Sequence, residues 1–297
     1  MSDRLRIALQ KKGRLAEGSY DLLKRCGLRF SVRGGQLLAR VKNMPIDLLL
    51  LRDDDIPSFV ANDAADIGIV GENVLEEERL TANPPLDAKV LMRLGFSRCR
   101  LCLAAPETGP REASALQGTR IASTYPGVLS RFLEEEGIKA RVVEMKGAVE
   151  LAPSIGIADS ICDLVSSGAT LEANKLTAFR TIMDSEAVLV GSSRALAPDK
   201  QVMLDRLMAR IDGVLKSQET KYIMLNAPRA ELDRIVDLIP GSDSPTVIPL
   251  AESQETGEDL VAVQAVCTET IFWETLEELK ALGARAILVL PIEKMMA

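Results

Sequence analysis

The chain has 297 residues, is 47% hydrophobic, carries a net charge of −7 and contains no histidine. A chain of this length can bury a full core and predicts two or three domains. The acidic balance, without a basic block of the kind that tracks a nucleic-acid backbone, argues against a nucleic-acid partner. Because no stretch is apolar for long enough to span a bilayer and the first residues do not resemble a signal peptide, we expect a cytoplasmic protein without a membrane partner. The lack of histidine removes the commonest general base, so chemistry is expected to rest on carboxylates, lysine, arginine and backbone amides.

The first part of the chain alternates short apolar runs with amphipathic stretches. The predicted strands are residues 4–9, 46–51 and 67–70, and the predicted helices are residues 15–26, 53–62 and 74–79. Strands that alternate with helices predict a parallel sheet covered by helices on both faces.

Charged and glycine residues follow these strands, where ligands of open α/β sheets bind. They are Lys11, Gly13 and Arg14 after the first strand, Arg52 after the second, and Gly71 and Glu72 after the third. A basic cluster at such a place fits an anion site about as well as it fits a solvated turn, so both interpretations stay open.

A second series of the same kind begins near residue 119. Its predicted elements are a strand at 120–122, a helix at 128–137, a strand at 140–144, a helix at 148–155 and a strand at 161–165. Residues 181–190 are predicted to form a strand that returns to the first lobe, and a helix follows at 199–218. Two α/β lobes with strand ends that face a shared cleft are therefore expected.

The loop after the strand at 161–165 is the most informative stretch. Ser166, Ser167, Gly168 and Ala169 are small, and Thr170 begins a segment that favours helix. Free N–H groups at such a turn bind phosphate, although an ordinary helix cap has the same composition. Asp159 and Asp163 accompany the strand. Carboxylates beside a phosphate repel a bare anion, so they fit ligands of sugar hydroxyls or of a divalent cation.

The last part of the chain has a different order of elements. Strands are predicted at 221–226, 246–250, 260–266 and 286–290, with helices at 229–238 and 270–282. The order βαββαβ is the ferredoxin-like motif, which is common among regulatory modules that bind amino acids. A simple oligomerisation domain is an equally open interpretation.

Several motifs together resemble the long form of the ATP phosphoribosyltransferase family. They are residues 8–15 (ALQKKGRL), 43–47 (NMPID), 52–57 (RDDDIP), 66–75 (DIGIVGENVL), the loop 159–170 and residues 288–294 (LVLPIEK). The resemblance implies transfer of a phosphoribosyl group from 5-phosphoribosyl 1-diphosphate (PRPP) to N1 of ATP, the first step of histidine biosynthesis. It also implies Mg²⁺ as cofactor, histidine as feedback inhibitor, and a homo-oligomer that exchanges between dimers and hexamers.

The same resemblance implies a domain organisation. Residues 1–95 with 180–218 would form the first of two lobes like those of periplasmic binding proteins, 96–179 the second lobe, and 219–297 an ACT-like regulatory domain.

The resemblance also assigns residues to sites. The PRPP phosphate would bind Ser166, Ser167, Gly168, Ala169 and Thr170, with Asp159 and Asp163 as catalytic acids, either of which could hold Mg²⁺. ATP and diphosphate would contact Lys11, Gly13, Arg14, Arg52, Gly71 and Glu72, and histidine would contact Asn226, Thr246, Val266 and Ala286. Two other interpretations share these features, namely a two-lobed solute-binding protein and a regulatory subunit without activity.

Overall fold

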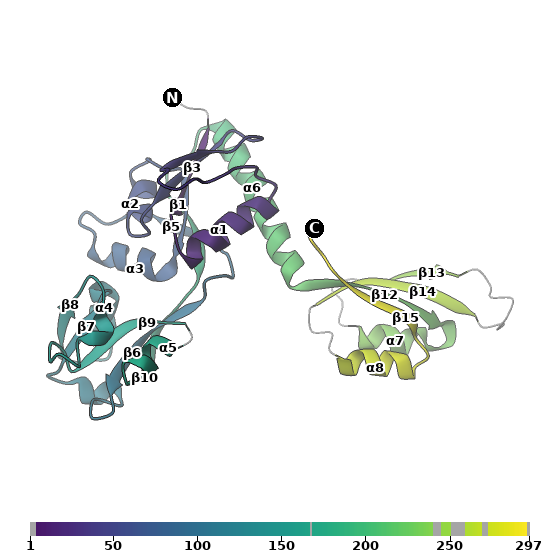
Figure 1. Ribbon diagram of the computed structural model, residues 1–297. Helices are drawn as coiled ribbons and strands as arrows, with labels where there is room; N and C mark the ends of the chain where they lie inside the picture. The colour runs from purple at the N-terminus through teal and green to yellow at the C-terminus, as the bar shows by residue number, and fades with distance from the viewer. Residues whose placement is uncertain (1–3, 167, 240–244, 251–258, 269–272, 296–297) are drawn as a thin grey trace. The chain divides into compact units, whose positions relative to one another are not determined.

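The computed structural model describes residues 4–166, 168–239, 245–250, 259–268 and 273–295 (Figure 1). The chain divides into two compact units, Met1–Leu204 and Asp205–Ala297. The division falls inside helix α6 (Pro198–Gln218), whereas we expected the whole helix to belong to the first lobe. Among the described residues, no helix is both long and apolar enough to cross a membrane.

The first lobe is built on a six-stranded sheet with the order β2-β3-β1-β4-β11-β5. Its strands are β1 (Leu5–Gln10), β2 (Leu38–Arg40), β3 (Ile46–Leu51), β4 (Ile67–Gly71), β5 (Lys89–Arg93) and β11 (Ala187–Gly191). The three central strands, β3, β1 and β4, are parallel. They are nearly continuous apolar runs because both faces of the sheet are covered.

Three helices accompany this sheet, as the alternating pattern predicted. They are α1 (Arg14–Arg25), α2 (Asp55–Ala61) and α3 (Glu72–Thr81). In α1 the buried positions Ala16, Leu22 and Leu23 recur at helical spacing, so one face of the helix packs on the lobe.

The second lobe has a five-stranded sheet with the order β10-β6-β9-β7-β8. Its strands are β6 (Cys99–Pro106), β7 (Arg120–Ser123), β8 (Arg141–Glu144), β9 (Ser160–Val165) and β10 (Leu176–Ser185). Strands β7, β8 and β9 are parallel, and α4 (Pro126–Glu135) and α5 (Ala169–Ala173) follow β7 and β9.

Two expectations for the second lobe are wrong. The predicted helix at 148–155 is only a 3-10 turn at Val149–Leu151, because Pro153 and Gly156 do not support a longer helix. The predicted strand at 181–190 is two strands, since β10 pairs with β6 through Ser185 and only β11 joins the first lobe. The second lobe therefore extends beyond residue 179.

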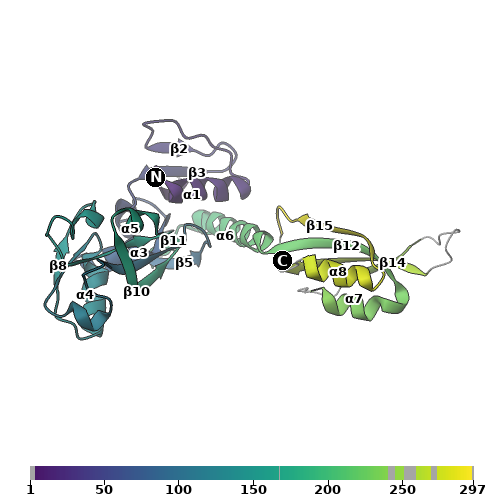
Figure 2. The ribbon, with the colours of Figure 1, turned by 60° about the horizontal axis from the view of Figure 1, so that its bottom comes forward.

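The second unit confirms the ferredoxin-like fold. Its sheet has the order β13-β14-β12-β15 and is antiparallel throughout. The strands are β12 (Thr220–Pro228), β13 (Thr246–Pro249), β14 (Leu260–Thr268) and β15 (Arg285–Pro291), and the helices are α7 (Leu232–Leu238) and α8 (Trp273–Ala281). Both helices cover the same face of the sheet (Figures 1 and 2), where Ile223, Val263 and Leu279 are fully buried.

Candidate active site

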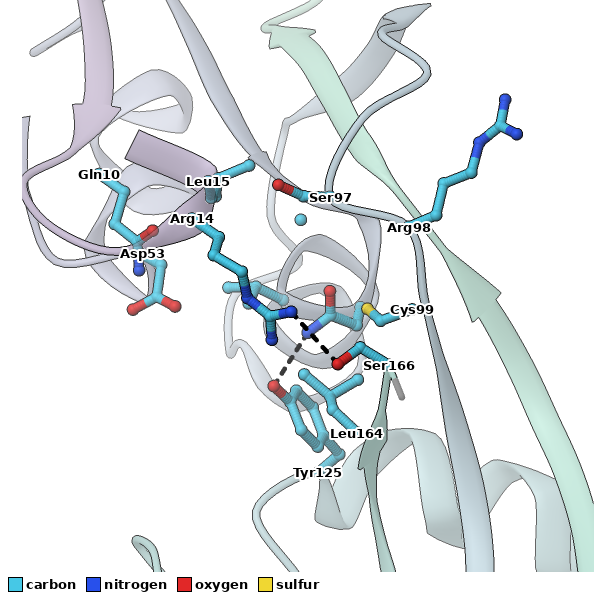
Figure 3. A pocket seen from close by; sticks show the side chains of 13 residues that line it. Gln10, Arg14, Leu15, Asp53, Ser97, Arg98, Cys99, Tyr125, Leu164 and Ser166 are labelled. Atoms are coloured by element: carbon cyan, nitrogen blue, oxygen red, sulfur yellow. Dashed lines mark hydrogen bonds between the residues drawn. The ribbon is translucent and has the colours of Figure 1, made fainter. Parts of the chain in front are cut away.

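A cavity of about 270 Å³ is lined by residues of both lobes of the first unit (Figure 3). The first lobe contributes Gln10, Arg14, Asp53, Gly71 and Asn73, and the second lobe contributes Cys99, Tyr125, Leu164 and Ser166. The first-lobe residues follow the carboxyl ends of β1, β3 and β4, where the topology predicts ligands.

Arg14 and the small-residue loop meet across this cavity. Gly13 has a positive φ of 99° and ends the turn after β1, so Arg14 begins α1. The Arg14 Nη1 donates a hydrogen bond to Ser166 Oγ over 3.2 Å, as Figure 3 shows. The structure thus brings together two groups that the sequence assigned to substrate binding in separate lobes.

The loop itself leaves room for a ligand. Gly168 has a φ of +86° and precedes α5, and apart from its chain neighbours no heavy atom of the described residues lies within 4 Å of the position that a Cβ would take. Ala169 and Thr170 form the first turn of α5, whose N–H groups have no partner within the helix. Ser167 lies outside the described residues.

Asp163 is the acid near this loop. It lies in the last half of β9, and its Oδ1 accepts the N–H of Leu164 over 2.8 Å. Burial raises the pKa of Asp163, a shift that the bond from Leu164 opposes and the charge of Glu150 increases. A partly buried carboxylate with an acidic neighbour fits a site that receives a hydroxyl or a cation.

Asp159 does not lie beside the loop with Asp163, which corrects the expectation that both acids serve the PRPP site. Asp159 precedes β9, at the opposite end of the strand from the loop. Its carboxylate accepts the backbone N–H of Arg120 over 2.8 Å and the Arg120 Nη2 over 3.0 Å. These bonds to Arg120 hold the pKa of Asp159 below its ordinary value. We conclude that Asp159 fixes the amino end of β9 beside β7 and serves the fold.

Lys11 and Arg52 line a neighbouring cavity of about 500 Å³. Gln10 and Asp53 line both cavities, so the two adjoin. The Arg52 guanidinium is bonded to Asp54 over 3.1 and 3.2 Å. Both basic residues are therefore close to the main cavity without lining it.

Gly71 lines the main cavity, whereas Glu72 is bound to an arginine. The Arg93 Nη1 donates to Glu72 Oε2 over 2.7 Å, and Arg93 also pairs with Glu186. The carboxylate of Glu72 thus forms an ion pair with Arg93, whereas we expected it to bind substrate.

Sequence reasoning missed a set of polar residues that joins the lobes. Asn73 of α3 donates from Nδ2 to the Tyr125 hydroxyl oxygen over 2.9 Å, and Ser185 donates to Asn73 Oδ1 over 2.8 Å. Burial raises the pKa of Tyr125 well above its ordinary value, so this phenol stays protonated. The one signal for this set in the sequence was the position of Asn73 after a predicted strand, where ligands of α/β sheets bind.

Glu77, one turn further along α3, joins the same lobes. Its carboxylate accepts the N–H of Gly127 over 2.8 Å and that of Val128 over 2.9 Å, in the first turn of α4. A Cβ at Gly127 would lie 2.9 Å from Thr81 Cγ2 and 3.0 Å from Leu80 Cβ. The glycine therefore permits the close approach of α4 to α3. We call this contact between the two helices, which includes the bonds of Glu77 to Gly127 and Val128, the α3–α4 seam.

The expected histidine contacts lie mainly on the sheet face that the helices leave open. Leu225 and Ala227 face the core, so Asn226 between them faces the other side. By the same alternation Val266 faces the open side, and so does Thr246, which is opposite Gln264. Ala286 has a φ of 51° next to an irregularity in the pairing of β12 with β15.

Comparisons with known proteins agree with this architecture. A family model described as ATP phosphoribosyltransferase matches residues 52–213, and one described as the HisG C-terminal domain matches residues 217–294. An ATP phosphoribosyltransferase of Maricaulis maris (strain MCS10) is 54% identical over 298 residues, which covers 100% of both chains.

A solved structure is similar to a large part of the chain. It is an ATP phosphoribosyl transferase (HisG:HisZ) complex from Thermotoga maritima, with a TM-score of 0.58 and 28% identity, covering 70% of this chain and 98% of that chain. The C-terminal domain that follows in the present chain matches its own family model. The chain therefore belongs to the ATP phosphoribosyltransferase family, in the long form that carries this domain within one polypeptide.

Proposed function

We propose that this enzyme joins C1 of PRPP to N1 of the adenine of ATP, which yields phosphoribosyl-ATP and diphosphate as the first step of histidine biosynthesis. The observation that carries the proposal is the contact of Arg14 in one lobe with Ser166 of the loop in the other, across a shared cavity. Two anionic substrates that must react with each other require such a cavity, with cationic and amide donors on both walls.

The PRPP phosphate is assigned to the loop. The open space over Gly168 accommodates the phosphate against the backbone, and the N–H groups of Ala169 and Thr170 are available to donate to it. Asp163, upstream on the same strand, holds the ribose hydroxyls or a cation.

The attack itself needs no general base, because N1 of adenine carries no proton to remove. The absence of histidine from the chain is therefore compatible with the chemistry. Alignment of the two substrates can supply roughly 7–11 kcal/mol of the barrier reduction. The remaining protein contribution is electrostatic, because the ring carbon becomes positive and the departing diphosphate negative.

Arginine and lysine side chains stabilise the departing diphosphate. Arg14 lines the main cavity, Lys11 and Arg52 line the neighbouring one, and a further cavity of about 480 Å³ is lined by Arg98 and Arg100. This last cavity shares Cys99 and Ser166 with the main one. Each of these adjoining cavities thus has at least one cationic side chain in its lining, which suits a leaving group with several negative charges.

The donor set is compatible with Mg²⁺ that is held largely by substrate. Among the described residues, no three acidic, cysteine or histidine side chains cluster as a metal cage. Protein-bound Mg²⁺ commonly uses only one or two carboxylates together with substrate phosphates, and Asp53 in the cavity or Asp163 beside the loop would serve. When bound, Mg²⁺ neutralises charge on the diphosphate.

Histidine inhibition is proposed to act through the second unit, with the inhibitor near Asn226, Thr246 and Val266. The open sheet face there also carries Leu288 and Leu290, which are 46% and 48% exposed. An uncovered apolar face supports assembly with other copies of the chain, for which we propose a dimer–hexamer equilibrium. All five cysteines are free, which supports a cytoplasmic location.

The test is to incubate the purified protein with ATP, PRPP and Mg²⁺. We expect an ultraviolet-absorbing adduct and an equal amount of diphosphate, both lost when either substrate is omitted or Mg²⁺ is chelated. Histidine should inhibit and change the sedimentation of the enzyme. Tight binding of PRPP without any turnover would instead indicate a solute-binding protein or an inactive regulatory subunit, and would refute the proposal.

A further inference from the structure

The side chains of Ser185, Asn73 and Tyr125 form a chain of hydrogen bonds in which each group donates to the next. Ser185 Oγ accepts the backbone N–H of Asn73 over 3.0 Å and donates its own hydrogen to Asn73 Oδ1 over 2.8 Å. Because the amide oxygen of Asn73 is taken by Ser185, the amide nitrogen faces the phenol and donates to it over 2.9 Å. The tyrosine oxygen is thus an acceptor in this chain of bonds.

The hydroxyl hydrogen of Tyr125 is left to bond elsewhere. Among the residues that the structure describes, this hydroxyl donates no hydrogen bond, and its one partner is the Asn73 amide that donates to it. Asn73 is buried and packed where α3 meets the second lobe, so the amide has little freedom to turn around. The phenol is also largely buried, which favours its neutral, donating form.

The Tyr125 hydroxyl group, whose hydrogen is free, belongs to a residue that lines the active-site cavity. Tyr125 and Asn73 line this cavity together with Arg14 and Ser166. In Figure 3 the tyrosine hydroxyl lies on the side of the ring that faces the Arg14 guanidinium and the Ser166 hydroxyl. A bound oxygen anion would find donors from Arg14, Ser166 and Tyr125 in one place.

We propose that Tyr125 is a substrate-binding residue that donates its hydroxyl hydrogen to an oxygen of PRPP, and that Asn73 is a positioning residue that directs this hydrogen into the cavity. The inference rests on the proposed function, because it takes PRPP as the occupant. It also fits the residue type at position 73, since an amide accepts from Ser185 with its oxygen and donates to Tyr125 with its nitrogen. An aspartate there would accept from both hydroxyls and turn the tyrosine hydrogen away from the ligand.

The test is a double-mutant cycle on PRPP affinity, measured by calorimetry without histidine. Tyr125→Phe removes the donor and should weaken PRPP about tenfold to a hundredfold, as expected for a bond to a charged group. Asn73→Asp should weaken PRPP by a similar factor in the presence of Tyr125. In the Tyr125→Phe background the same change should cost no more than about twofold, because the hydrogen that it misdirects is already gone.

Asn73→Ala and Tyr222→Phe complete the design. Asn73→Ala leaves the tyrosine hydrogen free but undirected, so it should weaken PRPP less than Asn73→Asp does. Tyr222→Phe removes a hydroxyl that is bonded to Gln264 in the other unit, and it should leave PRPP affinity within about twofold. Thermal unfolding of each variant reports whether the first unit stays folded.

Three results would overturn the inference. The first is unchanged PRPP affinity in Tyr125→Phe. The second is an equal loss from Asn73→Asp in both backgrounds, which would mean simple charge repulsion. The third is a larger loss from Asn73→Ala than from Asn73→Asp, which would mean packing alone. Adduct formation by the wild type tests the proposed function separately, so an active wild type with an additive cycle would reject only the directed hydrogen bond.

Discussion

Glu77 should contribute strongly to the stability of the first unit, and Glu77→Ala is the change that tests it. The glutamate is only 8% exposed, and its carboxylate accepts two backbone N–H groups of α4 over 2.8 and 2.9 Å. It belongs to the first lobe, whereas α4 belongs to the second. The substitution removes both bonds and leaves two N–H groups of α4 without a partner.

The magnitude follows from these contacts. A hydrogen bond to a charged group contributes about 1.5–3 kcal/mol. Water can reach part of the exposed α4 turn after the change, so the lower value for each bond is appropriate, and we expect a loss of about 3 kcal/mol in the free energy of unfolding. For a unit of this size each kcal/mol lowers Tm by about 2–4 °C, which predicts a decrease of roughly 6–12 °C.

The matched control is Glu76→Ala, on the same helix. Glu76 is 21% exposed and pairs with Arg79 over 2.6 Å and with Arg131 over 3.3 Å. Ion pairs near the surface contribute about 0–1 kcal/mol, so this variant should lose only a few degrees. Differential scanning calorimetry of the full chain measures both. Equal decreases in Tm for the two variants would refute the reasoning from burial at the α3–α4 seam.

Three further predictions concern the loop, the acid and the second unit. Gly168→Val should weaken PRPP binding at least a hundredfold, about the effect of losing two charge-assisted bonds. Gly137, which also has a positive φ and open space around it, is the control, and Gly137→Val should not weaken PRPP binding. Equal PRPP affinities of the two variants in calorimetry would reject the assignment of the phosphate to the loop. Because burial raises the pKa of Asp163, its ionised form destabilises the fold as pH rises through that pKa. Asp163→Asn should therefore not lower Tm at neutral pH. It should lower turnover, because it removes the charge proposed to hold the ribose or a cation. A lower Tm with full turnover would give the residue a structural role. A chain that ends at Gln218 should bind no histidine by calorimetry, and retained binding would place the inhibitor in the lobes.

The lobes and the loop could be predicted from the sequence because their signals are local. Buried parallel strands are continuous apolar runs, and amphipathic helices repeat at fixed spacing, so most elements were found without knowledge of their neighbours. The loop at Ser166 is likewise encoded in consecutive small residues after β9. Contacts between elements were not predictable in this way.

Asp159 illustrates the limit. It lies in the same motif as Asp163, but a strand advances about 3.3 Å per residue, so four residues place the two carboxylates about 13 Å apart along β9. The partner of Asp159 is Arg120, which is 39 residues earlier in the chain. Only the pairing of β7 with β9 brings these two residues together, and the sequence contains no local signal for it.

Asn73, Tyr125 and Glu77 were missed for the same reason. Their bonds across the lobes join residues that are about fifty or more positions apart, such as Asn73 and Tyr125 with a separation of 52. Each residue alone has an ordinary alternative role on a helix or in a turn. Polar groups acquire their function here from long-range packing, which composition and periodicity do not report.

The contacts between the lobes differ in burial, and this difference predicts where the cleft moves. The bond between Arg14 and Ser166 is exposed to solvent, so its loss costs little because water replaces each partner. The bond from Val128 to Glu77 is buried. The two segments that connect the lobes are also joined, since Ala187 donates to the Phe96 carbonyl and accepts from the Leu94 N–H, each over 2.9 Å.

Substrate exchange should therefore open the cavity at Arg14 and Ser166 while the α3–α4 seam stays closed. Hydrogen exchange measures this directly, because the N–H groups of Gly127 and Val128 are bonded to Glu77. We expect their exchange to be slow and nearly equal with and without PRPP, and to accelerate in Glu77→Ala. PRPP should instead slow exchange in the loop around Gly168. Strong protection of Gly127 and Val128 only when PRPP is bound would mean that the seam itself opens, and that the exposed contact does not define the moving side of the cleft.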